Sequence, residues 1–62
     1  MECRLREYRV KAGLTQAELA EMVNVRRETI SRLEWGKYNP SVQLAILISR
    51  AVKVPVEQIF II

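Results

Sequence analysis

The residues best suited to chemistry in this chain are arginines that gather near its middle. Arg26 and Arg27 are adjacent, and Arg32 follows a short distance later. A guanidinium can donate two hydrogen bonds to the O6 and N7 atoms of guanine, the commonest specific contact to a DNA base. It can equally bind a backbone phosphate. Both interpretations stay open for Arg27 and Arg32, and we expect at least one of them to contact guanine.

Glu28 lies between these arginines and also has two possible partners. Its carboxylate can accept a hydrogen bond from the N4 group of cytosine. It can also pair with Arg32, four residues later, in the favourable orientation for a helical salt bridge. The two contacts can coexist once DNA is bound. No catalytic constellation accompanies them, because the chain has no histidine and its Ser and Glu residues are accounted for by caps and pairs. We expect no enzyme activity.

Length and composition limit the remaining possibilities. The 62 residues fit one domain, residues 1–62, and a domain of this size buries only about 60% of its unfolded surface, so it gains from dimerising. The formal charge of +3 is a mild excess that suits an anionic partner. A single cysteine, Cys3, and no histidine exclude a disulfide scaffold and a Cys/His zinc site within one chain. We expect no cofactor, metal or small-molecule ligand, and an inert Cys3 thiol.

The sequence predicts neither a signal peptide nor a membrane span. Residues 2–11 are densely charged where a signal peptide needs an apolar core. The longest apolar run, residues 44–48, is far shorter than the roughly 20 residues that cross a bilayer. We therefore expect a cytoplasmic location.

The arginines belong to a segment, residues 16–35, whose pattern predicts two short helices joined by a tight turn. Its inner faces are marked by apolar residues at helical spacing: Leu19, Ala20, Val23, Ile30 and Leu33. Asn24 stands between the two helices, and Asn is one of the few non-glycine residues that enters the left-handed region readily. A left-handed residue there would turn the chain enough to cross the helices. The pattern indicates a DNA-binding helix-turn-helix with residues 26–35 as its third, outward-facing helix.

Local signals mark the preceding elements. Gly13 supplies a left-handed residue that ends a helix around residues 3–12. Thr15 and Glu18 form a T-x-x-E capping box that opens the next helix. Gln16 then takes the first helical position, beside free backbone N–H groups that attract phosphate, and we favour this role over that of a merely solvated residue.

Glu34 lies nearer to the inner face of the third helix than a lone carboxylate should. A partly buried carboxylate needs a partner. Arg9, on the inner side of the first helix, is the obvious candidate, so we expect a structural ion pair between the two.

The C-terminal part of the chain is strongly apolar. Ser41 is a good N-cap for a helix over residues 42–52, and a last short helix begins at Pro55. Large apolar side chains follow and predict a dimer interface: Ile59, Phe60, Ile61 and Ile62. Ile59 and Phe60 are also expected in the core. The β-branched residues at the very end favour a short strand over a continued turn.

The string LTQAELAEMVNVRRETISRLEWGKYNPS resembles the helix-turn-helix of the phage Cro and repressor family, also called the XRE family. The resemblance runs from LREYRVKAG to VPVEQIF, and the residues that match in register are Thr15-Gln16, Leu19-Ala20, Val25, Thr29-Ile30-Ser31 and Glu34-x-Gly36. It implies an all-α, five-helix, lambda-repressor-like domain whose third helix lies in the major groove. The chain looks most like small homodimeric repressors, some with a small sheet made from the chain ends.

The resemblance also implies roles for individual residues. Contacts to base edges are expected from Arg26, Arg27, Glu28 and Arg32. Phosphate contacts are expected from Gln16, Trp35, Lys37 and Tyr38. The alternative for Trp35 is a ring that covers the start of the following loop. Arg9 and Glu34 match the buried ion pair of the family.

Two positions depart from the family pattern. Asn24 stands where Gly is usual, which its left-handed tolerance allows. Arg26 stands where Ser or Thr normally caps the recognition helix, and losing such a cap costs roughly 1 kcal/mol. A cation there also opposes the helix dipole. A phosphate or base contact would offset both, so we interpret Arg26 as a DNA contact.

These observations predict a homodimeric, sequence-specific regulator that represses by occluding a promoter. Dimer symmetry would place two third helices in successive major grooves, ~34 Å apart, on a pseudo-palindromic operator. The alternative is a protein-interaction module, such as an antitoxin or adaptor, built on the same fold.

Overall fold

One backbone motif ends four helices of this protein and sets the turns between them. The computed structural model describes residues 2–62. The left-handed residues are Gly13, Asn24, Gly36 and Lys53, with φ of 76°, 61°, 72° and 61°. After each one, the next N–H bonds to the carbonyl five residues earlier, as between Leu14 and Arg9 at 3.1 Å and between Val25 and Ala20 at 2.9 Å. This is the Schellman arrangement, and it satisfies carbonyls that a helix end leaves free.

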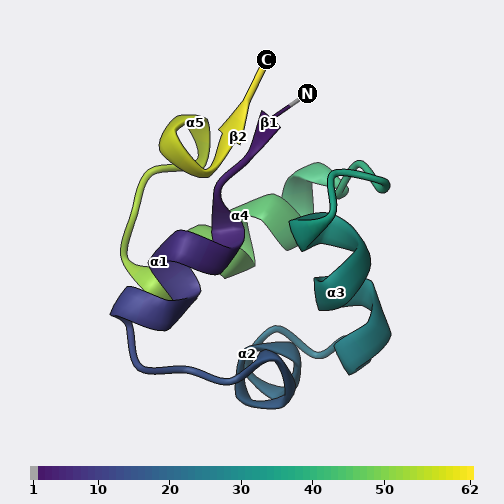
Figure 1. Cartoon of the computed structure of the whole chain (residues 1–62), viewed down its shortest axis with the longest axis vertical. Coiled ribbons are helices and arrows are strands. Elements are labelled where there is room, and N and C mark those ends of the chain that lie inside the picture. Colours follow the sequence, from purple (N-terminus) through teal and green to yellow (C-terminus); the bar gives the residue numbers. More distant parts are fainter. Residues whose placement is uncertain (1) are drawn as a thin grey trace.

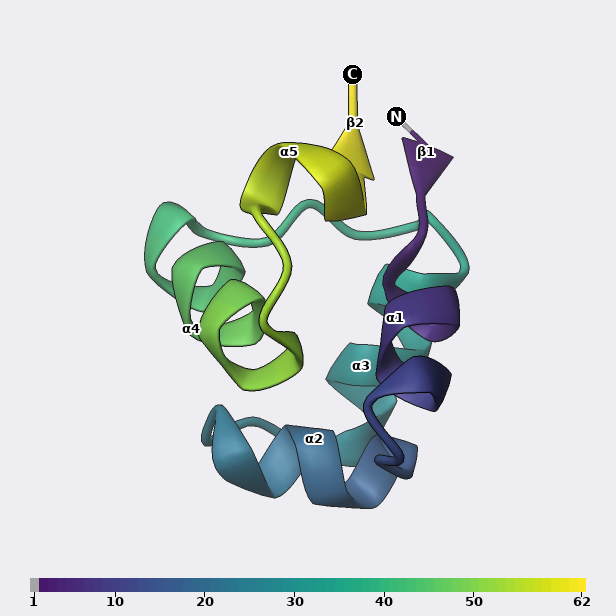
Figure 2. The ribbon, with the colours of Figure 1, turned by 90° about the vertical axis from the view of Figure 1, so that its left-hand side faces the viewer.

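The resulting fold is helical, with two short strands at the chain ends, as predicted. In chain order the elements are β1 (Glu2–Cys3), α1 (Leu5–Lys11), α2 (Gln16–Met22), α3 (Arg27–Glu34), α4 (Val42–Val52), α5 (Val56–Ile59) and β2 (Phe60–Ile61). Both chain ends lie at one end of the molecule, and α2 lies at the opposite end (Figures 1 and 2). The third helix agrees with its predicted range to within one residue at each end.

The two strands pair antiparallel, with Glu2 opposite Ile61 and Cys3 opposite Phe60. The strand expected at the C-terminus is therefore confirmed, and its partner is the N-terminus of the same chain. This pairing also corrects the first helix, which begins at Leu5 instead of near Cys3. The backbone groups of residues 2 and 3 belong to the sheet, and the N–H of Arg4 donates to the carbonyl of Ile59 at 2.8 Å. Residue 1, part of the domain predicted over residues 1–62, lies outside the described residues.

Every helix contributes to one apolar core. The largest fully buried side chains are Leu5, Leu19, Ile30, Leu33, Ile48 and Ile59. Removing an aliphatic side chain of this size from water contributes about 2 kcal/mol. The other four helices share this core with α3. Burial of Ile30 and Leu33 therefore determines which side of α3 faces outward.

Ile59 and Phe60 are core residues, as expected, and this removes Ile59 from the predicted dimer interface. Their side chains are 0% and 7% exposed within a single chain. Ile59 has no exposed surface for a second copy, whereas Phe60 lines an apolar groove together with Ile62, so Phe60, Ile61 and Ile62 of the predicted set remain available. Within residues 2–62, no helix is long and apolar enough to cross a membrane.

Candidate functional site

The outer face of α3 gathers the predicted base-contacting residues. Arg27, Glu28 and Arg32 are exposed on α3, and Arg26 is exposed just before it. They face outward because Ile30 and Leu33 hold the opposite side of α3 in the core. The helical repeat then directs the remaining positions toward solvent. The structure thus presents one charged surface, with three guanidinium groups and one carboxylate.

The N-terminus of α3 lacks a side-chain cap. Arg26 has the extended conformation of an N-cap residue, with φ −80° and ψ 154°, but its side chain makes no capping hydrogen bond. The guanidinium has only donors, whereas a cap must accept a bond from a backbone N–H. The sequence-based expectation of a missing cap is therefore confirmed.

The side chains on this face are also free of ion pairs with one another. Among residues 2–62, the ion pairs join Arg4 to Glu2 and Arg9 to Glu34. The helical salt bridge, one of the two possible contacts of Glu28, is not formed with Arg32. Exposed pairs at this spacing contribute only about 0.5 kcal/mol after the cost of ordering two long side chains.

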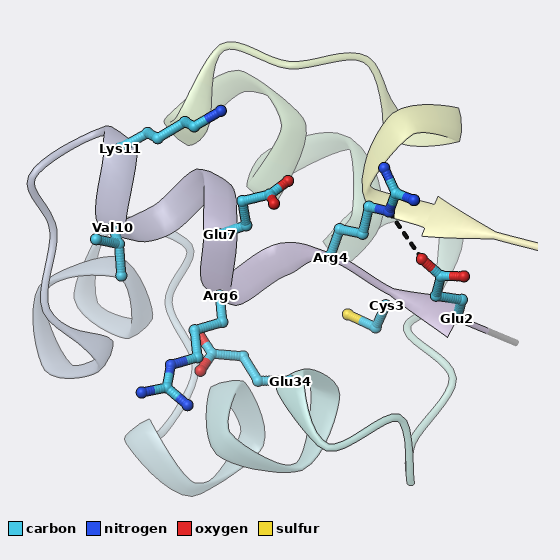
Figure 3. Close-up of a pocket in the computed structure, with 8 residues that line it drawn as sticks. All are labelled: Glu2, Cys3, Arg4, Arg6, Glu7, Val10, Lys11 and Glu34. Carbon is cyan, nitrogen blue, oxygen red and sulfur yellow. Dashed lines mark hydrogen bonds and ion pairs between the residues drawn. The ribbon is translucent and has the colours of Figure 1, made fainter.

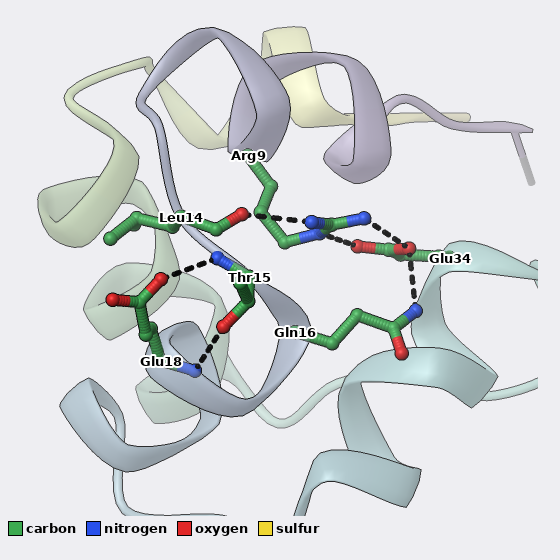
Figure 4. A network of polar contacts seen from close by, with 6 residues as sticks. All are labelled: Arg9, Leu14, Thr15, Gln16, Glu18 and Glu34. Atoms are coloured by element: carbon green, nitrogen blue, oxygen red, sulfur yellow. Dashed lines mark hydrogen bonds and ion pairs between the residues drawn. The ribbon is translucent and has the colours of Figure 1, made fainter.

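A partly buried polar network fixes the other end of α3 (Figure 4). Arg9 Nε donates to Glu34 Oε2 at 2.6 Å, and Gln16 Nε2 donates to Glu34 Oε1 at 3.0 Å. Arg9 also donates to the carbonyl of Leu14 at 2.8 Å. The side chains of Arg9 and Glu34 are 12% and 5% exposed. The expected ion pair is present, and the network ties α1, α2 and α3 together.

This network borders a hollow of about 460 Å³ that lies between α1, α2 and the end of α3. Its lining residues are Arg6, Arg9, Gln16, Glu34 and Trp35. Gln16 is held against Glu34 and is therefore not a freely solvated residue. The Trp35 side chain is 74% exposed, so it covers little of the loop. The sequence reading missed Arg6, although it stands three residues before Arg9 and hence on a neighbouring part of α1.

The start of α2 is closed by the predicted capping box (Figure 4). The N–H of Glu18 donates to Thr15 Oγ1 at 3.0 Å, and the N–H of Thr15 donates to Glu18 Oε1 at 2.8 Å. The bond from the Thr15 backbone lowers the pKa of the Glu18 carboxyl, because it stabilises the ionised form. The box holds Gln16 at the first position of α2.

A second hollow, of about 200 Å³, lies on the other flank of α3. It is lined by Thr29, Arg32 and Tyr38. Tyr38 is 42% exposed, and Lys37 beside it is exposed in the loop after α3. The sequence reading missed Thr29, whose position three residues before Arg32 places both on one stripe of the helix. The predicted phosphate-contacting residues are thus divided between the two hollows and the loop.

A third hollow, of about 820 Å³, lies over the outer side of α1 (Figure 3). Its charged lining residues are Arg4, Arg6, Lys11, Glu2, Glu7 and Glu34. Positive and negative groups balance there, so this surface does not favour an anion. Cys3 also lines it, and burial raises the pKa of the thiol, which keeps it protonated and weakly reactive. In residues 2–62, no group of three or more His, Cys, Asp or Glu side chains is placed to hold a metal ion.

Comparisons with known proteins agree with this geometry. The sequence model of the helix-turn-helix family matches residues 5–59. An uncharacterized HTH-type transcriptional regulator of Archaeoglobus fulgidus is 56% identical over 61 residues, covering 98% of this chain and 87% of that relative. The P22 c2 repressor, solved in complex with a synthetic operator, has a TM-score of 0.83 and 30% identity over 87% of this chain and 82% of that one. The restriction-modification controller protein C.AhdI of Aeromonas hydrophila has a TM-score of 0.82 and 30% identity, over 92% of this chain and 86% of that one.

Proposed function

The chain belongs to the helix-turn-helix family of XRE transcriptional regulators, and on that premise we propose that it binds double-stranded DNA with α3 in the major groove. The observation that carries the proposal is the outer face of α3, where Arg27 and Arg32 are exposed and free of ion pairs within the described chain. Unpaired guanidinium groups on a fixed helix suit recognition of base edges and phosphates. The solved operator complex of the P22 c2 repressor, a relative by fold and sequence, supports this ligand.

The proposed contacts follow from the position of each residue. Arg26, Arg27 and Glu28 stand at the start of α3, the part of a recognition helix that reaches base edges. Phosphate contacts are assigned to the residues beside the helix: Gln16, Trp35, Lys37 and Tyr38. Phosphate contacts supply affinity and salt dependence, whereas base contacts supply sequence preference. The exposed guanidinium of Arg26 would bind DNA where a shorter residue would cap the helix.

We further propose that the protein acts as a homodimeric repressor. An apolar groove of about 470 Å³ lies between the start of α4 and the chain end, and its lining includes Val42, Val56 and Ile62. Val42 is 77% exposed, and Ile62 is fully exposed. A second copy seated on this face would remove these side chains from water and present two α3 helices to a pseudo-palindromic site. A dimer bound across a promoter would repress by occlusion.

DNA binding is tested by selecting bound duplexes from a random pool and measuring affinity for a selected and a shuffled duplex at several salt concentrations. We expect tight, salt-dependent binding with clear preference for the selected sequence. Arg27→Ala should reduce that preference by about tenfold, the lower part of the range for a bidentate base contact. Arg50→Ala removes the same charge from α4 and serves as the matched control. Equal affinity for both duplexes would instead favour the protein-interaction module.

Dimerisation is tested by sedimentation at micromolar concentration. We expect the native protein to sediment as a dimer and Ile61→Glu or Ile62→Glu to shift it to a monomer, because a buried carboxylate at the interface would be desolvated. Val10→Glu changes an apolar residue that is 59% exposed on α1, away from the proposed face, and should leave the dimer intact. A native monomer, or a dimer unaffected by both C-terminal variants, would contradict this interface.

A further inference from the structure

The segment that lines the apolar groove from the C-terminal side has little structure of its own. The helix α5 has four residues, Val56–Ile59, and Pro55 before it supplies no side-chain cap. A helix this short is not stable by itself, because nucleation is unfavourable and few hydrogen bonds follow it. β2, which comes next, has two residues. The positions of Phe60 and Ile62, which line the groove, must therefore be fixed by other parts of the chain.

β1 fixes this segment through its backbone. The N–H of Arg4 donates to the carbonyl of Ile59 at 2.8 Å, where α5 passes into β2. Facing pairs along an antiparallel ladder alternate between hydrogen-bonded and non-hydrogen-bonded. Glu2 and Ile61, two steps further along the same register, are therefore the next bonded pair. The backbone of residues 2–4 thus holds the chain on both sides of Phe60.

The side chain of Cys3 supports the same residue. Cys3 lies opposite Phe60, in the non-hydrogen-bonded position, where facing Cα atoms are only about 4.5 Å apart and side chains are close. Phe60 is buried in the core, and Cys3 is partly buried against it. Phe60 also lines the groove, whereas Cys3 lines the hollow over α1. Phe60 therefore forms a wall of the groove that β1 supports from the other side.

This pairing is easily opened. A sheet of two strands, each of two residues, is marginal by itself. Such segments open locally at a much lower free energy than the helices of a core. Opening would release Phe60 and Ile62 together and remove one wall of the groove. The other wall, which includes Val42, would stay in place because α4 is anchored in the core by Leu44 and Ile48.

We propose that β1 is a strap that controls dimerisation. Paired with β2, it holds the groove in the form that a second copy can cover; released, it leaves a folded monomer. This inference rests on the proposed dimer and names the element that regulates it. The affinity of the dimer is then set by the fraction of chains with a closed strap. Because α3 is unaffected, a released monomer would still bind half an operator, but it would lose the gain from binding both halves together.

Substitutions at Cys3 test the strap. Cys3→Asp should open it, because a carboxylate there would be partly buried beside Phe60 and would share a hollow with the negative Glu34. A threefold loss of the closed form in each of two protomers should raise the dissociation constant of the dimer about tenfold. Sedimentation equilibrium over a range of concentrations measures this constant.

Two variants serve as matched controls in the same experiment. Cys3→Val keeps an apolar side chain that suits a strand, so the dissociation constant should stay within about threefold of the native value. Val10→Glu adds a carboxylate to the same hollow from α1, without touching the sheet, and should also leave the dimer intact.

Two further measurements distinguish a released strap from a general loss of stability. In Cys3→Asp, hydrogen exchange should accelerate at the Ile61 amide, while the amides of Ile30 and Leu33 in α3 stay as protected as in the native protein. Affinity for a duplex with one half-site should be unchanged. Affinity for the full operator, obtained by selection from a random pool, should fall about tenfold because only the dimer binds both halves.

The strap and the dimer on which it rests fail in different ways. A Cys3→Asp variant that dimerises as tightly as the native protein, or whose half-site affinity falls as far as its full-site affinity, would overturn the strap. Loss of the dimer in Cys3→Val would do so too, because a side chain that preserves the pairing must preserve the dimer. A native protein that sediments as a monomer at every concentration would instead overturn the proposed dimer.

Discussion

The two helices of the helix-turn-helix are nearly equal in length but begin in opposite ways. At the start of α2, Thr15 and Glu18 satisfy each other's backbone N–H groups. At the start of α3, Arg26 satisfies none. The side chain of Gln16, at the first position of α2, bonds within the protein. At the first position of α3, the exposed Arg27 makes no ion pair in the described chain.

The start of α2 therefore contributes to the stability of the fold, whereas the start of α3 is available for binding. At the start of α2, the Thr15–Glu18 cap and the bond from Gln16 to Glu34 form inside one chain and stabilise the fold whether or not a ligand is present. Among the charged side chains of α3, only Glu34 is bonded within the described chain, and Arg27, Glu28 and Arg32 are left to an external partner. A small domain is stable by only a few kcal/mol, so each cap or ion pair is a sizeable share.

Glu34→Ala should have the largest effect, because it removes the group that anchors α3 to α1 and α2. Breaking a buried ion pair on one side leaves a desolvated charge, here Arg9, and costs about 3 kcal/mol. Chemical denaturation measures the loss of unfolding free energy. The double variant Arg9→Met with Glu34→Leu should recover most of it, since no unpaired charge remains. A single variant as stable as the native protein would show that the network does not anchor α3.

Thr15→Ala and Arg26→Ser form a matched pair at the two helix starts. Thr15→Ala should lower the free energy of unfolding by about 1 kcal/mol through loss of the cap, and Arg26→Ser should raise it by a similar amount by adding one. Arg26→Ser should also weaken DNA binding, because the proposed contact is lost. Thermal melting and DNA titration measure the two effects. An Arg26→Ser variant that binds DNA as tightly as the native protein would remove Arg26 from the interface.

Asn24 tests the turn that joins the helices. At φ 61°, a residue with an ordinary Cβ is strained, and Asn24→Ala should cost about 1 kcal/mol of unfolding free energy. Asn24→Gly relieves steric strain but increases the freedom of the unfolded chain, so the two effects should nearly cancel, to within about 0.5 kcal/mol. Thermal melting distinguishes the variants. Equal stability of the Ala and Gly variants would mean that the turn does not require a left-handed residue.

The smallest effect should appear on acidification at the start of α2. The pKa of Glu18 is lowered in the folded protein from its ordinary value of 4.5. Its contribution to stability should be fully present above pH 4.5 and be lost as the pH falls through the lower, folded-state pKa. Glu18→Gln keeps a capping oxygen without the charge. Melting temperatures of the two proteins should therefore converge between neutral and acidic pH; a constant difference would contradict this titration.

Local signals predicted most of the helix boundaries, because the interactions that set them span only a few residues. Gly13 and Asn24 indicated left-handed turns, and both have positive φ. Ser41 indicated a cap, and its Oγ accepts from the N–H of Leu44 at 3.1 Å. The left-handed conformation of Lys53, in contrast, had no signal, because lysine shows no preference for that region. There the positions of α4 and α5 require the turn, whatever residue occupies it.

The sequence by itself determined the helical fold, the outward face of α3 and the need of Glu34 for a partner. These follow from helical periodicity, capping chemistry and the cost of burying a charge. Tertiary structure alone decided that Gln16 joins that partner's network and that the C-terminal strand pairs with the N-terminus of the same chain. It also placed Tyr38 beside Thr29 and Arg32. Such contacts join residues far apart in the chain, or depend on the exact direction of a turn, and no local pattern encodes either.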